Sequence, residues 1–131
     1  GVGRRLKAAH PHVQIILADP VGSGLASWVN SGQIGADSAY AVEGIGGSAA
    51  PENLHRDVID GSESVSDEES FDMVRRLVVE EGLLVGGSSG TNVVAALRLA
   101  QRGGFDGPIV TVLPDSWDRS RDQPWMSAWN K

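Results

Sequence analysis

The chain contains no cysteine, so it has neither a disulfide framework nor thiolate chemistry. Aromatic side chains make up only 5% of its 131 residues, and no apolar run approaches the roughly 20 residues of a membrane span. The opening segment, Gly1–Lys7, has neither an initiator Met nor the apolar core of a secretory signal. These absences favour a cytoplasmic protein, and the opening segment suggests an interior piece of a longer protein.

Basic residues are outnumbered, since 11 Lys and Arg face 17 Asp and Glu and the net charge is −6. This balance argues against nucleic-acid binding, because the field of the whole molecule would oppose contact with phosphates. The three histidines have no metal-ligand spacing, so we expect no metal site. A hydrophobic content of 40% and 17 glycines describe one globular domain with many tight turns.

Apolar runs alternate with helix-compatible segments. Near-continuous runs at 13–18, 83–85 and 108–113 predict buried strands, and 39–42 and 58–59 predict two shorter ones. Helices are expected at 2–9, around 25–29, from the capping box of Ser66 and Glu69 to Gly82, and at about 92–101. The alternation predicts an α/β fold, a parallel sheet in a three-layer domain.

The turn Gly86–Gly90 is the most informative segment. It follows an apolar run and precedes a helix, so its small residues leave backbone N–H groups open at a helix N-terminus. Ser88 and Ser89 in this turn either bind a ligand or cap the helix, and the local sequence favours neither. Asp115 follows another predicted strand and is either a helix cap or a charge directed into a site. Parallel strands would bring both turns to one edge of the sheet, which favours a ligand site.

Two other segments have open interpretations. Glu43–Gly47 either wraps closely around a ligand or forms a simple loop, with equal support. The polar tail from Trp117 to Lys131 carries three tryptophans and is expected to pack over the body of the domain. Gly1-Val2-Gly3 only begins like a dinucleotide-binding fingerprint, because Leu6 replaces its third glycine.

A series of ordered motifs, together with these segments, resembles the pyridoxal-phosphate enzymes of fold type II, in particular cystathionine β-synthase and cysteine synthase. The motifs run from Gly1 to about Ser116 and include Ala18-Asp19-Pro20, Val42–Gly46, Pro51-Glu52, Val65–Glu69, Glu80–Gly90 and Leu113–Ser116. The resemblance implies that the whole of residues 1–131 is the C-terminal part of such a catalytic core. It also implies pyridoxal 5'-phosphate as the cofactor.

The resemblance assigns roles to six residues. Ser88 matches the serine whose hydroxyl bonds the pyridine nitrogen of the cofactor, and a neutral donor there suits β-elimination and replacement. Asp115 and Ser116 match the segment near the same end of the ring. Three residues match a loop that borders the cleft for substrate and cofactor: Gly44, Ile45 and Gly46. The implied reaction is β-replacement on serine or O-activated serine with a sulfur nucleophile, as in the biosynthesis of cysteine and cystathionine.

Several family features are missing. Neither Lys7 nor Lys131 matches the context of the Schiff-base lysine, and the phosphate loop would precede Gly1. Ser120 stands where the family usually has tyrosine. We therefore expect the chain alone to be inactive and the complete enzyme to be a homodimer with an amino-acid substrate. The alternative is a non-catalytic interaction or regulatory module that retains the core of the fold. A generic nucleotide-binding domain has only the glycine turns in its favour.

Overall fold

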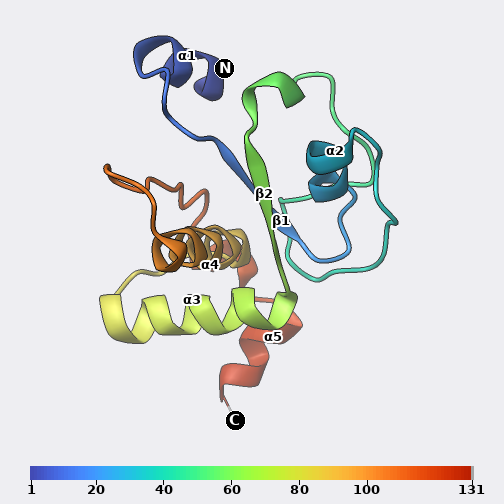
Figure 1. Ribbon diagram of the computed structural model, residues 1–131. Coiled ribbons are helices and arrows are strands. Elements are labelled where there is room, and N and C mark those ends of the chain that lie inside the picture. The colour runs from blue at the N-terminus through green and yellow to red at the C-terminus, as the bar shows by residue number, and fades with distance from the viewer. Residues whose placement is uncertain (131) are drawn as a thin grey trace. The chain divides into compact units, whose positions relative to one another are not determined.

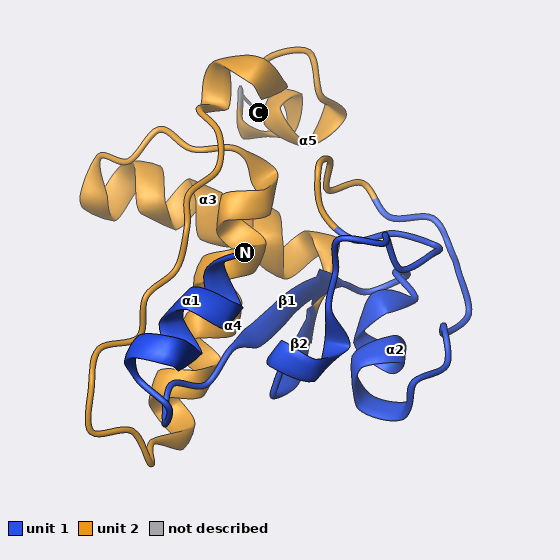
Figure 2. Ribbon diagram, turned by 90° about the horizontal axis from the view of Figure 1, so that it is seen from above, with its two compact units in different colours: residues 1–40, 46–64 blue, residues 41–45, 65–131 orange. Residues whose placement is uncertain are grey.

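The computed structural model describes residues 1–130, which form two compact units (Figure 1). The first unit consists of Gly1–Tyr40 and Gly46–Ser64, and the second of Ala41–Ile45 and the chain from Val65 onward (Figure 2). No helix within the described residues has the length and apolar composition needed to cross a membrane. Each unit draws on separate stretches of the chain.

The first unit is built around a two-stranded sheet. Its elements are α1 (Val2–Ala9), β1 (Ile16–Pro20), α2 (Leu25–Ser31), the 3-10 helix η1 (Arg56–Val58) and β2 (Gly61–Val65), whose last residue opens the second unit. The two strands lie side by side and run in the same direction (Figure 1). The strand predicted at 13–18 is therefore present, although it starts later.

The strand predicted at 58–59 is wrong, because Val58 ends η1 and β2 begins at Gly61. The sequence of β2 is Gly-Ser-Glu-Ser-Val, which has almost no β-branched or aromatic residue to signal a strand. Its pairing is instead fixed from outside the strand. The Asp60 amide donates to the Ile15 carbonyl at 2.8 Å, and the Ile15 amide donates to the Asp60 carboxylate at 2.7 Å.

Lys7 binds the same Asp60 carboxylate. Its Nζ is 2.6 Å from Asp60 Oδ2 and donates to the Val13 carbonyl at 3.1 Å. Burial raises the pKa of Asp60, but the bonds from Lys7 and the Ile15 amide outweigh it and lower that pKa below its ordinary value of 3.8. Lys7 is thus occupied as a structural cation that joins α1 to the sheet.

The second unit is helical. It contains α3 (Asp67–Glu81), α4 (Gly87–Arg102), the 3-10 helices η2 (Trp117–Ser120) and η3 (Ala128–Asn130), and α5 (Pro124–Ser127). The predicted capping box at the start of α3 is confirmed, since Ser66 Oγ accepts from the Glu69 amide at 3.2 Å and the Ser66 amide donates to Glu69 at 3.0 Å. Gly82 ends the helix in the left-handed conformation, with φ of 69°.

Helix α4 begins earlier than predicted. Residues 87–90 of the Gly-Gly-Ser-Ser-Gly segment form the first turn of the helix, Gly86 is its N-cap, and all five residues are buried. Neither Ser88 nor Ser89 caps the helix, because the N-cap is Gly86 and has no side chain. The Gly86 amide instead donates to the Asp115 carbonyl at 3.1 Å. Buried glycines and serines are poor helix formers, so tertiary packing overrides propensity here.

Three predicted strands are absent. Residues 39–42, 83–85 and 108–113 belong to no strand, and Val85 forms only an isolated antiparallel bridge with Ser116. Their apolar composition is typical of strands, but a strand exists only when a neighbour supplies the other half of each hydrogen-bonded pair. Within residues 1–130 the only sheet is the pair β1 and β2.

Helices α3 and α4 pack at very close range (Figure 2). The hydroxyls of Ser70 and Thr91 lie 2.8 Å apart, and both residues are fully buried. A methyl group added at Gly90 would overlap the Ser70 carbonyl oxygen and lie 2.9 Å from Val74. Only glycine fits at this crossing.

We therefore predict that Gly90→Ala lowers the free energy of unfolding by about 2 kcal/mol or more, because the helices must move apart. Alanine in an unconstrained helix would instead stabilise the protein by about 1 kcal/mol. Urea denaturation measures the change. Gly107→Ala is the control, since its added methyl group meets open space. A stabilised Gly90→Ala protein would contradict this packing.

The capping box also predicts a dependence of stability on pH. The bond from the Ser66 amide lowers the pKa of Glu69 below its ordinary 4.5, with help from Arg98 and against the effect of burial. The unfolded chain therefore binds this proton more readily, and the stabilisation is present above about pH 4.5 and lost as the pH falls through the lower, folded value.

We expect Glu69→Gln to flatten the acid limb when urea midpoints are compared between about pH 6 and about pH 3. Glu68→Gln changes an exposed carboxylate in the same turn and serves as the control. The interpretation fails if Glu69→Gln and the unaltered chain lose equal stability on acidification.

Candidate functional site

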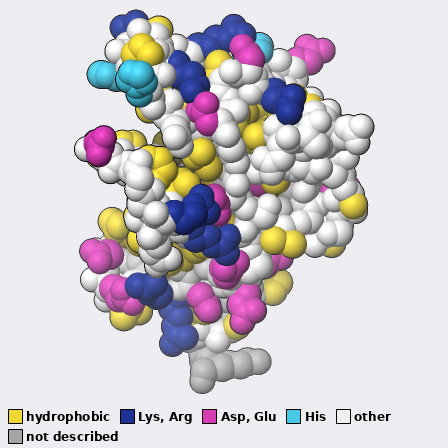
Figure 3. All heavy atoms as spheres, viewed as in Figure 1, with side chains coloured by type: hydrophobic (Ala, Val, Ile, Leu, Met, Phe, Trp, Pro, Cys, Tyr) yellow, Lys and Arg dark blue, Asp and Glu magenta, His cyan; other side chains and the backbone are white. Residues whose placement is uncertain are grey.

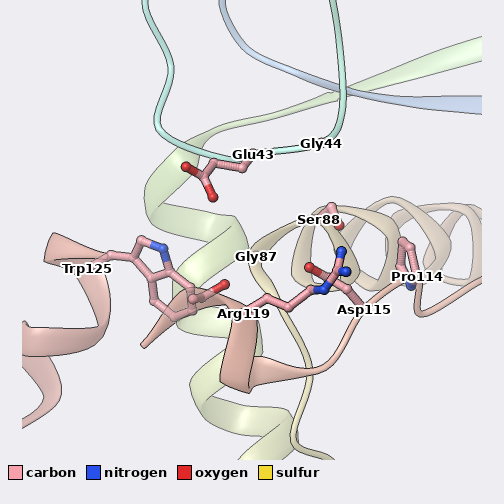
Figure 4. Close-up of a pocket in the computed structure, with 9 residues that line it drawn as sticks. Glu43, Gly44, Gly87, Ser88, Pro114, Asp115, Arg119 and Trp125 are labelled. Atoms are coloured by element: carbon pink, nitrogen blue, oxygen red, sulfur yellow. The ribbon is translucent and has the colours of Figure 1, made fainter. Parts of the chain in front are cut away.

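A cavity of about 570 Å³ opens within the second unit, at the N-terminal end of α4 (Figure 4). Its walls come from the 41–45 segment, from α4 and from the chain between 114 and 125. The lining residues are Glu43, Gly44, Gly87, Ser88, Pro114, Asp115, Arg119, Ser120 and Trp125. Backbone amides at a helix start, two serine side chains, two carboxylates and one guanidinium thus share a cavity that admits a small molecule.

The first turn of α4 forms one wall. Ser88 lines the cavity and is only 5% exposed, so only a small part of the residue faces open space. A side chain at Gly87 would come within 3.0 Å of the Phe71 ring, and one at Gly86 would collide with the Asp115 carboxylate. Glycine at these two positions lets neighbouring groups approach the helix start closely.

Asp115 is the most unusual member of the site. Its Oδ1 atom is buried and has no hydrogen-bond partner within the described residues. Buried polar atoms nearly always have a partner, so an unpaired one beside a cavity marks a place where a donor from a ligand would fit. The partial positive charge of the α4 N-terminus next to it favours a carboxylate there. The buried Ser89 hydroxyl is likewise unpaired.

The wall formed by the 41–45 segment is held in place by the carboxylate of Asp67, at the start of α3. The amides of Ala41 and Val42 donate to the two oxygens of Asp67, at 2.7 and 3.1 Å. These bonds fix the short segment that presents Glu43 and Gly44 to the cavity. Glu43 in turn accepts from the Gln123 side chain at 2.8 Å, which links this segment to the C-terminal tail.

The tail closes the cavity with an aromatic stack. The Trp125 ring lies parallel to Phe71 of α3, at 4.5 Å and 7°, and Trp129 packs edge-on against it at 5.3 Å. The packing predicted for the tail over the body is thus observed at Trp125, whereas Trp129 packs on Trp125 within the tail. Arg119, on η2, extends its guanidinium into the cavity (Figure 4). Ser120, at the position where the resemblance called for tyrosine, is buried in the wall.

The cavity brings together only some of the residues expected from the sequence. Ser88, Asp115 and Gly44 line it, whereas Ser116 and Ile45 do not. The Ser116 hydroxyl bonds Asp118 and thereby lowers the pKa of that carboxyl. Gly46 belongs to the first unit, where a side chain would meet Pro20 and Tyr40. The ligand roles predicted for all six residues stay predictions.

Sequence reasoning missed Glu43, Arg119 and Trp125. Glu43 belongs to the segment Glu43–Gly47, but the roles predicted for that segment were assigned to Gly44, Ile45 and Gly46. No local signal marks Arg119 or Trp125, because their place in the wall depends on how the tail folds back onto α3. Within residues 1–130, no group of three or more His, Asp or Glu side chains is arranged to hold a metal ion.

Comparison with known proteins gives a consistent result. The family model described as pyridoxal-phosphate dependent enzyme matches residues 1–115. Cysteine synthase 1 of Emericella nidulans is 39% identical over 127 residues, which cover 94% of this chain and 34% of that protein. Cystathionine beta-synthase of Apis mellifera is 42% identical over 116 residues, covering 88% of this chain and 22% of that protein.

Solved structures agree. The O-acetylserine dependent cystathionine beta-synthase of Helicobacter pylori has a TM-score of 0.75 and 40% identity, over 90% of this chain and 36% of that one. Cysteine synthase of Entamoeba histolytica, at 23% identity, shares the fold with a TM-score of 0.86, over 96% of this chain and 36% of that one. The α/β fold of fold type II enzymes, predicted from the sequence, is confirmed. The chain thus spans 22% to 36% of the length of these relatives, and it belongs to the family of pyridoxal-phosphate dependent enzymes.

Proposed function

We propose that this chain is the C-terminal part of the catalytic core of a pyridoxal-phosphate dependent enzyme. The complete enzyme replaces the β-substituent of serine or O-activated serine by a sulfur nucleophile and so makes cysteine or cystathionine. Family membership supports this, as do relatives named cysteine synthase and cystathionine beta-synthase. The observation that carries the proposal is the nearly buried Ser88 hydroxyl on the wall of a cavity at the start of α4.

The residues present suit the pyridine end of the cofactor. Ser88 offers a neutral hydroxyl, which would donate a hydrogen bond to the ring nitrogen and leave that nitrogen without a proton. The unpaired Oδ1 of Asp115 would accept a hydrogen bond from a donor group of the ligand rather than pair with this nitrogen. Gly86 and Gly87 carry no side chain that would block access to the helix start. When bound, pyridoxal phosphate supplies an electron sink for elimination and replacement at the β-carbon.

The other assigned residues have unequal support. Gly44 lines the cavity and so supports a role at the border of the cleft. The proposed roles of Ser116, Ile45 and Gly46 depend on the resemblance alone.

Covalent attachment of the cofactor requires a lysine from outside this chain's cavity. Lys7 is held by Asp60 and the Val13 carbonyl in the first unit, and Lys131 lies outside the described residues. The proposal is therefore that the chain alone contributes the ring-nitrogen site and has no activity by itself.

The proposal extends to the setting of the complete enzyme. It acts on a small amino-acid substrate, as a homodimer, in the cytoplasm. The names of the relatives support the substrate class, and the resemblance supports the homodimer. The net charge of −6 and the charged content of 21% are compatible with the cytoplasm.

A binding experiment on the 131-residue chain tests the ring-nitrogen site. Pyridoxine is the probe, because it keeps the pyridine ring but has no aldehyde and cannot react with amines. We expect saturable NMR shifts of the Gly87 and Ser88 amides, and about 2- to 10-fold weaker binding in Ser88→Ala, the value of one hydrogen bond. Ser127→Ala, an exposed serine in the same unit, is the matched control and binds as the unaltered chain does.

Two results would overturn the proposal. One is the absence of saturable shifts at Gly87 and Ser88, and the other is equal binding by Ser88→Ala and the unaltered chain. An assay of β-replacement by the chain alone, with pyridoxal phosphate added, is expected to show no turnover, and measurable turnover would contradict the assignment of the lysine to another part of the enzyme.

A further inference from the structure

Three charged side chains line the cavity at the start of α4, namely Glu43, Asp115 and Arg119. Glu43 has a partner within the protein, because it accepts from the Gln123 side chain at 2.8 Å. The other two charges lack such partners. Asp115 Oδ1 is buried and unpaired, and the Arg119 guanidinium forms no hydrogen bond or ion pair with any residue in the described range 1–130. A carboxylate and a guanidinium are thus both available to a molecule in the cavity.

Asp115 and Arg119 both lie close to Ser88. A side chain at Gly86 would collide with the Asp115 carboxylate, which places that carboxylate against the N-cap of α4. Ser88 is two residues further along, in the first turn of the same helix. The Arg119 side chain extends from η2 across the cavity, with its guanidinium directed toward Ser88 and Asp115 (Figure 4). A ring that binds the Ser88 hydroxyl would therefore have both charges as near neighbours.

These neighbours offer a pyridine nitrogen two alternative partners. Without a proton, the nitrogen accepts a hydrogen bond from the Ser88 hydroxyl. With a proton, the nitrogen becomes a cationic donor, and the unpaired Oδ1 of Asp115 is a fitting acceptor for it. Ser88 alone does not decide between the two forms, because a hydroxyl can accept as well as donate. The forms differ by one positive charge, so the charges of the cavity wall select between them.

The positive charges near Ser88 outweigh the negative one. Asp115 contributes one negative charge, whereas Arg119 contributes one positive charge and the N-terminus of α4 about half of one more. Glu43 belongs to the wall of the 41–45 segment, and its carboxylate points away from Ser88 (Figure 4). Acidic and basic side chains are mixed on the face of the molecule drawn in Figure 3, and water and salt screen such distant charges. The wall around Ser88 therefore disfavours a protonated ring.

We infer that Arg119 keeps a pyridine nitrogen bound at Ser88 free of a proton. The cavity then selects the neutral form of a ring and rejects the pyridinium form. Arg119 lies beyond the match to the family model, which ends at residue 115, and the neighbouring Asp118 on η2 does not line the cavity. The inference rests on the proposed binding of a pyridine ring at Ser88, and it assigns control of the ring proton to a different residue.

The experiment follows the ring nitrogen of nitrogen-15-labelled pyridoxine bound to the 131-residue chain. Its chemical shift changes on protonation, so a titration between about pH 5 and about pH 9 measures the proton affinity of the bound nitrogen. We expect this affinity to be lower than in free pyridoxine. In Arg119→Gln it should be about 3- to 10-fold higher than in the unaltered chain, the effect of one partly screened charge. Arg119→Lys retains the charge and should retain the low proton affinity.

Arg121→Gln is the matched control. It removes an equal charge from the same tail, but Arg121 lies over the Trp117 ring, 5.7 Å from its centroid, and does not line the cavity. We expect it to leave the proton affinity of bound pyridoxine unchanged. Asp115→Asn removes the alternative acceptor and should lower the proton affinity, which is the opposite of the change in Arg119→Gln.

The affinity for pyridoxine supplies a second readout. Because the bound ring lacks the proton, binding should tighten as the pH rises toward the pKa of the nitrogen in free pyridoxine. Arg119→Gln should weaken this dependence, since the bound nitrogen then keeps its proton to a higher pH.

The outcomes separate this inference from the proposed function. Equal proton affinities in Arg119→Gln and the unaltered chain, or an equal change in Arg121→Gln, would overturn the inference and leave the ring-nitrogen site intact. A bound nitrogen with a higher proton affinity than free pyridoxine would also overturn it, because Asp115 would then hold the proton. The absence of saturable binding at Gly87 and Ser88 would overturn both.

Discussion

The close crossing of α3 and α4 is the constraint on which the second unit depends. Gly90 brings the α4 backbone against the Ser70 carbonyl, and the Ser70 and Thr91 hydroxyls bond each other beside it. A larger residue at Gly90 would separate the helices. Since Ser88 lies half a turn before this contact, the crossing also determines where the serine hydroxyl stands in the cavity wall. The helix packing and the position of Ser88 in the cavity wall are therefore set by the same contact.

Two carboxylates hold other parts of the cavity wall in place. Asp67, in the first turn of α3, binds the amides of Ala41 and Val42 and so places one wall. Asp115, beside the start of α4, accepts the Gly86 amide through its backbone carbonyl and keeps one side-chain oxygen unpaired. Both acids stand at positive helix ends, where a negative charge is favoured. The helix termini thus organise the cavity before any ligand enters.

Features that depend on residues close together in the sequence could be predicted, and features that depend on distant residues could not. The capping box at Ser66 and the terminator Gly82 involve neighbours in sequence, and both are observed as expected. The early start of α4 depends on burial against α3, which no local pattern reveals. Arg119 and Trp125 reach the cavity only because the tail folds back on Phe71. The order of the motifs predicted the family correctly, whereas the apolar runs predicted three strands that are absent. Motifs follow from the ligand that a family binds, but a strand forms only where a partner strand is present.

The exposed segment 108–113 and the ring-nitrogen site of the proposed function differ in the range of the contacts that they need. Helix ends satisfy their amides within a few residues, so the ring-nitrogen wall on α4 can form from this chain's own contacts. A parallel strand cannot do this, because its hydrogen bonds all go to other segments that lie far away in sequence. The covalent attachment of the cofactor in the proposed function would be non-local in the same way, since Lys7 is bonded to Asp60. The local contacts at the start of α4 are therefore present in a chain that spans 22% to 36% of these relatives, whereas the lysine of the proposed function has to come from outside this cavity.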